Sequence, residues 1–261
     1  MEKIKKTSGN FVNSNGHIIP KPFGTDYELE PGKVYTLVHD RDLYMDYLEE
    51  DKDFEFPKTY YLNDKDNKFI NKTIDTFNKT EKMTTGILLS GMKGSGKTLM
   101  AKKIAKESGL PIIVVDSKVS SDDIEPFFAK ITDDVCVIFD EIDKYWSTRY
   151  LLGFLDGVKP TCKKMVIATC NDEKDINVYL NDRCSRIRYK KRFGGLEKNT
   201  VKGIINDIIK DKDKANAAAE YICSNVETIS YDNVIIFGEE IKNSPEDSFD
   251  DIIEFLNIAK R

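Results

Sequence analysis

Arginine is scarce in this chain of 261 residues, whose 40 basic residues comprise 33 lysines and 7 arginines. Four of the arginines nevertheless lie in one short stretch, DRCSRIRYKKR, at residues 182–192. Arginine offers a rigid, planar and permanently charged fork that binds phosphate or carboxylate through two hydrogen bonds at once. The concentration of so scarce a residue indicates that one of these anions lies nearby.

Zinc-binding patterns are also absent. The chain has two histidines, His17 and His39, and an odd number of cysteines with no two at CxxC spacing. Zinc sites in sequences are recognised by closely spaced pairs of such ligands. We therefore predict reduced thiols, a cytosolic protein and no zinc site. The five cysteines are Cys136, Cys162, Cys170, Cys184 and Cys223.

The sequence has no apolar run of 18 residues, so we expect no membrane span. The first ten residues, MEKIKKTSGN, are charged and no apolar segment follows them, so we expect no secretory signal. A net charge of −5 argues against a general nucleic-acid binder, because such proteins normally carry a basic domain or stripe. With 40% hydrophobic residues, the chain is long enough for one sizeable domain and a smaller one.

Short apolar runs alternate with amphipathic segments from Gly86 onward. Runs that are apolar at every position are typical of strands covered on both faces of a parallel sheet, and the alternation predicts repeated βαβ units. SRIRYKK adds a possible edge strand. The four apolar runs are GILLS (86–90), PIIVVD (111–116), VCVIFD (135–140) and MVIATC (165–170).

The remaining segments suggest a smaller part on each side of this core. Residues 1–25 are expected to form an irregular arm, 33–40 a short strand, 42–50 a helical turn and 66–79 a helix with one buried face. From Gly194 onward the pattern predicts three helices and a possible fourth. We divide the chain into an N-terminal arm or small α+β segment (1–65), an α/β core (66–193) and a helical lid (194–261).

The stretch GMKGSGKT fits the phosphate-loop pattern G-x-x-x-x-G-K-[ST] between a predicted strand and a predicted helix. Backbone N–H groups of such a loop bind phosphate, Lys97 reaches the β and γ oxygens, and Thr98 holds Mg²⁺. We expect Lys97 to be exposed. A glycine-rich turn without a ligand is the alternative. The predicted phosphate-binding residues are Gly91, Met92, Lys93, Gly94, Ser95, Gly96, Lys97, Thr98 and Leu99.

Polar residues follow two of the later apolar runs. Asp140 and Glu141 end VCVIF, and we expect Asp140 to hold Mg²⁺ and Glu141 to polarise the attacking water, with Asp143 as the next candidate for that role. Asn171 ends MVIATC, where a neutral amide can align the water. A solvated strand end is the alternative in both cases, since Asn often ends strands.

The order of GxxxxGKT, DEID, Asn and Arg-x-x-Arg resembles that of the AAA+ ATPases over roughly residues 60–245. The resemblance implies a P-loop (ASCE) core with a five-stranded parallel sheet in the order 5-1-4-3-2, a helical lid, bound ATP and Mg²⁺, and rings that are commonly hexamers. It also implies that Arg183 and Arg186 are arginine fingers that reach the site of a neighbouring subunit. Arginines that bind carboxylates across an interface are the alternative, and Arg188 and Arg192 fit it better.

The branch of the family stays open. The segment 117–128 lacks the aromatic-hydrophobic-glycine loop of threading translocases, and residues 194–260 contain no arginine of the kind that clamp loaders place in the lid. We favour an ATP-driven remodeller of an unidentified protein partner. A replication-associated loader acting on DNA and a nucleotide-gated self-assembly are the alternatives. The compact chain is also similar to small AAA+ proteins of large bacteriophages, so we expect it in the bacterial cytosol, in a phage-infected cell.

Overall fold

The computed structural model of the chain describes residues 9–14, 16–25, 28–40, 45–56, 63–81, 84–146, 154–155, 162–175 and 187–261, with only the backbone at 9–14, 19–25 and 175. Arg183, Arg186 and Cys184 lie outside these residues. The chain divides into two compact units. The first comprises Met1–Glu55, Asn67–Ser90 and Thr98–Lys191, and the second comprises Phe56–Asp66, Gly91–Lys97 and Arg192–Arg261.

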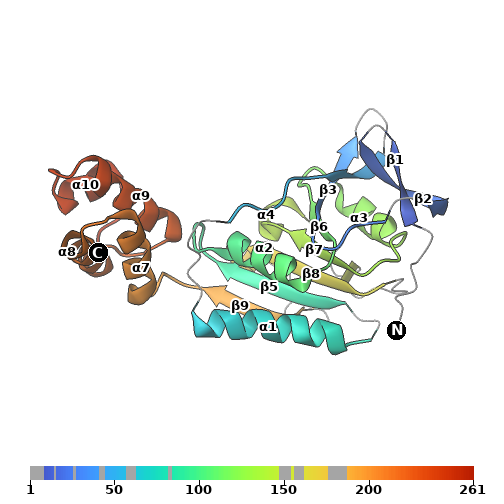
Figure 1. The fold of residues 1–261 in the computed structure, drawn as a ribbon, viewed down its shortest axis with the longest axis horizontal. Helices are drawn as coiled ribbons and strands as arrows, with labels where there is room; N and C mark the ends of the chain where they lie inside the picture. Colours follow the sequence, from blue (N-terminus) through green and yellow to red (C-terminus); the bar gives the residue numbers. More distant parts are fainter. Residues whose placement is uncertain are drawn as a thin grey trace. The chain divides into compact units, whose positions relative to one another are not determined.

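A nine-stranded sheet forms the centre of the first unit, in the order β1-β2-β4-β3-β6-β7-β8-β5-β9 (Figure 1). The pairs β6–β7, β7–β8 and β8–β5 are parallel, and reading from β9 to β6 gives the expected order 5-1-4-3-2. The predicted α/β core is therefore confirmed. The core strands are β5 (Thr85–Gly91), β6 (Ile112–Val115), β7 (Val135–Phe139), β8 (Lys164–Cys170) and β9 (Ile187–Phe193).

The N-terminal segment extends this sheet, which corrects two expectations. The irregular arm is instead the antiparallel pair β1 (Gly9–Ser14) and β2 (His17–Thr25), and the helical turn is instead β4 (Met45–Glu50). The predicted strand at 33–40 is confirmed as β3 (Val34–Asp40), which pairs antiparallel with β4 and parallel with β6. Ladder hydrogen bonds to neighbouring strands determine these conformations, and propensity within one segment does not reveal them.

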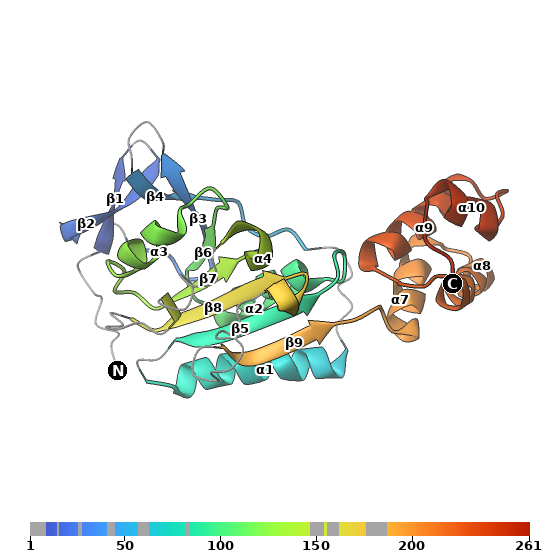
Figure 2. The ribbon, with the colours of Figure 1, turned by 180° about the vertical axis from the view of Figure 1, so that it is seen from behind.

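Helices cover the sheet. The predicted helix at 66–79 is confirmed as α1 (Asp64–Lys79), and α2 (Lys97–Ser108) lies on one face of β5 and β8 (Figures 1 and 2). Every residue of β5, β7 and β8 is buried, which explains their uninterrupted apolar runs. The short helices α3 (Ser121–Phe128) and α4 (Ile142–Tyr145) bring Phe128 and Trp146 into an aromatic cluster with Phe139 and Phe154.

The second unit contains all four helices predicted after Gly194. Its core is separate and is built around Ile205, Ala219, Phe237 and Ile253, all fully buried. Side chains at the N-caps define where the last three helices begin, as when Ser230 accepts a hydrogen bond from Asn233 N–H. The helices are α7 (Lys198–Ile208), α8 (Lys212–Asn225), α9 (Tyr231–Asn243) and α10 (Phe249–Phe255).

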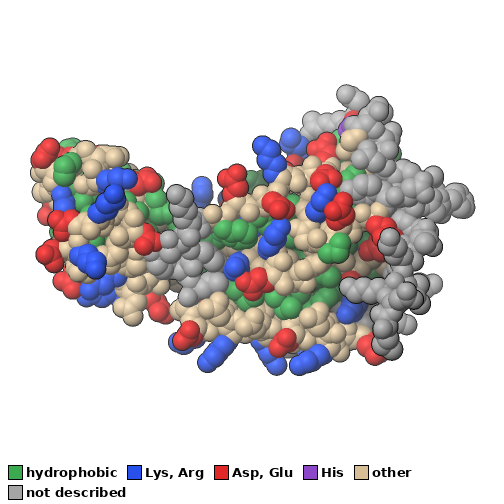
Figure 3. Space-filling model, viewed as in Figure 1, with side chains coloured by type: hydrophobic (Ala, Val, Ile, Leu, Met, Phe, Trp, Pro, Cys, Tyr) green, Lys and Arg blue, Asp and Glu red, His purple; other side chains and the backbone are tan. Residues whose placement is uncertain are grey.

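Surface and thiol chemistry agree with the composition. Acidic and basic side chains are interspersed over the described part of the face in Figure 3. None of the described helices combines the length and the apolar character that crossing a membrane requires. Burial raises the pKa of the Cys136 thiol. The expectation of reduced thiols stays a prediction.

Candidate nucleotide site

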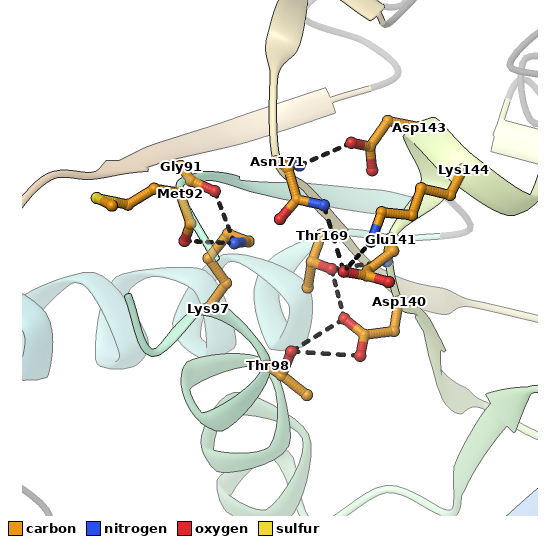
Figure 4. A network of polar contacts seen from close by, with 10 residues as sticks. All are labelled: Gly91, Met92, Lys97, Thr98, Asp140, Glu141, Asp143, Lys144, Thr169 and Asn171. Carbon is orange, nitrogen blue, oxygen red and sulfur yellow. Dashed lines mark hydrogen bonds and ion pairs between the residues drawn. The ribbon is translucent and has the colours of Figure 1, made fainter. Parts of the chain in front are cut away.

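The predicted phosphate loop joins the end of β5 at Gly91 to the start of α2 at Lys97. The Lys97 ammonium turns back onto this loop, where Nζ donates to the carbonyl of Gly91 at 2.6 Å and to that of Met92 at 2.8 Å (Figure 4). The expectation that Lys97 is exposed is wrong, because these contacts leave only 6% of the residue accessible. The loop therefore holds a buried cation on its own carbonyl groups.

Glycine is required at two positions of this loop. Gly94 has a φ of +72°, and a Cβ there would lie 2.7 Å from Asp232 Oδ2. The Gly94 carbonyl accepts a 2.7 Å hydrogen bond from Tyr231 N–H, so the first turn of α9 packs directly on the loop. Gly91 has a φ of +137°, and a Cβ there would collide with the carbonyl oxygen of Phe193. Only glycine adopts these angles without strain and leaves room for both neighbours.

Thr98, in the first turn of α2, contacts Asp140, which follows β7. Thr98 Oγ1 donates to Asp140 Oδ1 at 3.0 Å, with Oδ2 at 3.2 Å (Figure 4). The hydroxyl of Thr169 on β8 also donates to Asp140 Oδ1. Hydroxyl and carboxylate oxygens are the hard ligands that Mg²⁺ prefers, and it is usually bound through few protein groups and the phosphates of a substrate. The donor set fits the predicted ion.

Glu141 adopts a left-handed backbone conformation, with φ 52° and ψ 54°. Its N–H donates to Thr169 Oγ1 at 2.9 Å, which fixes the residue on the sheet. Its Oε1 accepts hydrogen bonds from Asn171 Nδ2 at 3.3 Å and from Lys144 Nζ at 2.8 Å (Figure 4). The bond to Glu141 raises the pKa of Lys144. Non-glycine residues in this region are uncommon and cluster at functional sites, where the surrounding contacts maintain them.

Asn171 follows β8, as predicted, and lies beside Glu141. Its backbone N–H donates to Asp143 Oδ2 at 3.0 Å. The other carboxylate oxygen of Asp143 is buried and has no hydrogen-bond partner among the described residues. Asp143 therefore supports the end of β8. Four of the residues singled out in the sequence, Thr98, Asp140, Glu141 and Asn171, come together in the first unit.

Two residues of this group were missed in the sequence. Thr169 belongs to an apolar run, and only its interior position hinted that its hydroxyl needed partners. Lys144 stands three residues after Glu141, a spacing that brings side chains together on a helix, and α4 is too short for periodicity to show it.

A pocket of about 410 Å³ opens beside Thr98 and Asp140. Part of its wall is residues 51–55, which directly follow β4, and Val114 and Ile138 contribute apolar surface. Lys102 Nζ lies 5.2 Å from the centre of the Phe54 ring, across this wall. Residues 1–65 are expected from the sequence to form an arm or small segment of their own, so this wall is not predicted.

His39, Asp46 and Asp123 bring three possible metal-ligand atoms within 4.8 Å of one another. His39 and Asp46 face each other across β3 and β4, with Nδ1 2.9 Å from Oδ1, and Asp123 comes from α3. A cross-strand pair of this kind stabilises a sheet without any ion. The expected absence of zinc, which rested on sequence spacing, stays a prediction.

Three comparisons relate the chain to known proteins. Residues 87–192 match the model of the AAA family, described as the ATPase family associated with various cellular activities. A stretch of 65 residues is 35% identical to the ATP-dependent zinc metalloprotease FTSH 12, chloroplastic, of Arabidopsis thaliana, over 25% of this chain and 6% of that protein. Two RuvB variants of Thermotoga maritima share the fold, with TM-scores of 0.59 and 0.57 and identities of 18% and 19%. Each alignment covers 78% of this chain, and 74% and 73% of those chains.

A GxxxxGKT loop between a buried parallel strand and a helix is typical of P-loop nucleotide-binding proteins. Within that class, the match of residues 87–192 to the AAA family model supports an AAA+ P-loop domain over this part of the chain. The resemblance noted in the sequence is thereby confirmed. Since the chain spans only 6% of the length of its curated relative, the activity of that whole protein does not carry over.

Proposed function

We propose that the chain is a Mg²⁺-dependent ATPase that assembles into a ring, commonly a hexamer in this family, and remodels or disassembles a protein partner. The observation that carries ATP hydrolysis is the arrangement around Thr169. One buried hydroxyl links the Asp140 carboxylate to the backbone of Glu141, whose carboxylate accepts from Asn171. A metal ligand and a base for water are thus fixed together at neighbouring strand ends.

Each residue then has a defined task. The loop 91–99 binds the phosphates, and Lys97 exchanges its carbonyl contacts for phosphate oxygens. Thr98 directly follows Lys97, so with Asp140 it would hold an ion within reach of those phosphates. Bound Mg²⁺ supplies neutralisation of the phosphate charge. Glu141 accepts a hydrogen bond from the attacking water, and Asn171 keeps that carboxylate oriented.

We prefer remodelling of a protein over a DNA-directed ATPase activity because of the residues that contact the phosphate loop. The first turn of α9 presents Tyr231 and Asp232 to Gly94, where a loader would carry an arginine. The interspersed surface charges also offer no broad basic face among the described residues in Figure 3. The fold shared with RuvB supports the DNA-directed alternative through architecture alone. Nucleotide-gated self-assembly is the third possibility.

The test uses Glu141→Gln, which keeps the shape of the side chain and removes its charge. ATP affinity, measured by calorimetry, should equal that of wild type, whereas turnover should fall by about 10²-fold or more. Lys97→Ala is the control for binding and should lose ATP affinity. Near-normal turnover in Glu141→Gln would contradict the proposal, and Asp143→Asn would then test the next candidate base.

The same proteins separate the biological roles. Glu141→Gln should hold ATP and retain the protein partner in affinity purification. Stimulation of wild-type turnover by single-stranded DNA would favour the loader instead. Slow turnover with ATP-dependent assembly, and no partner retained, would favour self-assembly.

A further inference from the structure

His39, Asp46 and Asp123 form a cluster of partly buried side chains that the proposed function does not use. Three atoms that can bind a metal, one imidazole nitrogen and one oxygen from each carboxylate, lie within 4.8 Å of one another. The cross-strand pair accounts for His39 and Asp46, whose Nδ1 and Oδ1 are 2.9 Å apart. It does not account for Asp123, which comes from α3.

The fold brings these side chains together from three elements. His39 and Asp46 are opposite each other on β3 and β4, so their side chains lie on one face of the sheet. Leu48, two residues after Asp46, is fully buried on that face and belongs to the same core as Ile124 of α3. This packing brings the first turn of α3, and with it Asp123, to the cross-strand pair. No closely spaced pair of ligands marks such a site, so sequence spacing could not reveal it.

The charges of the cluster favour a cation. Asp46 and Asp123 place two carboxylates close together at partly buried positions. Among the described residues, neither carboxylate forms an ion pair with a lysine or an arginine, and His39 is the ring partner of Asp46. Like charges at this separation repel each other, and partial burial strengthens the repulsion because less water screens it. A divalent cation among the three ligand atoms would replace this repulsion by attraction.

The donor set indicates which ion fits. Imidazole nitrogen suits Zn²⁺ and related transition ions, whereas Mg²⁺ and Ca²⁺ prefer shells of oxygen. Zn²⁺ binds nitrogen and carboxylate oxygen at about 2.0–2.2 Å, and three protein ligands leave its fourth position to water. Such bonds place ligand atoms roughly 3.3 Å apart, so the ion would draw the three side chains closer together.

We propose that His39, Asp46 and Asp123 form a Zn²⁺ site that fastens α3 to the β3–β4 pair. The site would replace the expectation of no zinc, which rested on closely spaced ligands. It would join the N-terminal extension of the sheet to a helix of the core through bonds that metal removal breaks. The site is independent of ATP hydrolysis.

The test uses the full chain without an affinity tag, stripped of metal by a chelator and titrated with Zn²⁺ in a calorimeter without nucleotide. Wild type should bind one equivalent. Asp123→Asn should weaken this binding by about tenfold or more, because loss of a direct ligand costs at least as much as loss of an outer-shell partner. His39→Gln should weaken it likewise. The matched control is Asp122→Asn, which changes an exposed carboxylate in the same helical turn and should bind zinc as wild type does.

Melting temperatures separate metal binding from a purely structural role. Both asparagine variants remove one carboxylate from the first turn of α3, so they should melt alike without zinc. Zinc at a hundredfold excess over the wild-type Kd should raise the melting temperature of wild type and of Asp122→Asn by roughly 5 °C. The rise should be absent or much smaller in Asp123→Asn.

Cobalt in place of zinc identifies the ligands. Bound Co²⁺ should give d–d bands without the charge-transfer band of a cysteine thiolate, and a thiolate band would place the ion elsewhere and overturn the site. No zinc binding by wild type, or equal affinity in wild type, Asp123→Asn and His39→Gln, would also overturn it. An Asp123→Asn protein that melts below Asp122→Asn without zinc, and gains as much from zinc, would show that Asp123 has a structural role instead.

Discussion

The Thr169 hydroxyl forms two hydrogen bonds from within β8, whose seven residues are all buried. It donates to Asp140 and accepts from the backbone N–H of Glu141. Removing it would leave a carboxylate and an N–H group with fewer partners in a site of low accessibility. An unmade hydrogen bond at a buried position costs about 1–3 kcal/mol.

Thr169→Val is therefore expected to slow hydrolysis while leaving ATP bound. Valine has nearly the same shape as threonine, so packing in β8 is kept and only the hydroxyl is lost. The melting temperature should fall modestly, and kcat should fall more strongly than ATP affinity does. Thr169→Ser retains the hydroxyl and should stay near wild type in kcat. Equal rates for the valine and serine variants would show that this hydroxyl does not organise the site.

The sequence predicts residues of this site where a local pattern includes them. Thr98, Asp140 and Asn171 occupy fixed places relative to a loop or a strand end, so their convergence could be expected. Burial of Lys97 could not be expected, since it depends on carbonyl groups whose direction is set by the loop. Thr169 has the appearance of core packing, and Lys144 that of an ordinary surface lysine.

Among the elements, the phosphate loop and α9 are linked through Gly94. The Gly94 carbonyl accepts a hydrogen bond from the backbone N–H of Tyr231. The Asp232 carboxylate occupies the space that a Cβ at residue 94 would need. Any side chain at residue 94 would have to adopt a left-handed backbone angle and also displace Asp232. The loop and the start of α9 thus constrain each other.

Gly94→Ala should lower both the melting temperature and the ATP affinity. The left-handed angle alone costs an alanine about 1–2 kcal/mol. Gly109→Ala is the matched control, because Gly109 has a similar φ of +68° but nothing within 4 Å of a Cβ. The excess loss in Gly94→Ala measures the contact with α9, and adding Asp232→Ala should recover part of it. Identical losses at both glycines would mean that α9 does not constrain the loop.

Elements with one dominant signal were predictable, and those that depend on partners were not. Uninterrupted apolar runs predicted the strands β5, β7 and β8, and apolar residues at helical spacing predicted α1. The sequence of residues 42–50 favours a helical turn, yet Leu48 pairs with Leu37 across β3 and β4, and both are fully buried. Their burial depends on the pairing of β3 with β4, which the residue pattern within 42–50 alone does not reveal.

At the scale of the whole molecule, the arginine cluster points to assembly. Arg183 and Arg186 remain proposed fingers, and they lie outside the described residues. The division of the chain at residues 65 and 193 is likewise a proposal. Fingers supplied by a neighbour contribute on the order of 10³ to 10⁵ in rate. A single chain would then have an incomplete site, and hydrolysis would depend on assembly.

Arg183→Ala should bind ATP and lose most hydrolysis, and Arg183→Lys should do little better, since an ammonium lacks the planar fork. Mixing Arg183→Ala with Glu141→Gln under subunit exchange should restore activity. In the restored sites, a Glu141→Gln subunit lends its finger to an Arg183→Ala neighbour with an intact carboxylate. The measurement is ATPase rate against mixing ratio. Full activity of Arg183→Ala alone would exclude Arg183 as a finger.

The link between Gly94 and Tyr231 also sets an order of events during synthesis. The phosphate loop leaves the ribosome early, whereas its partner in α9 emerges only after every strand of the sheet has been translated. A nascent chain can therefore complete its sheet while the loop still lacks the helix that packs on it. Nucleotide capture at full affinity would then follow completion of the sheet. ATP would thus favour nascent chains in which α9 has already packed on the loop.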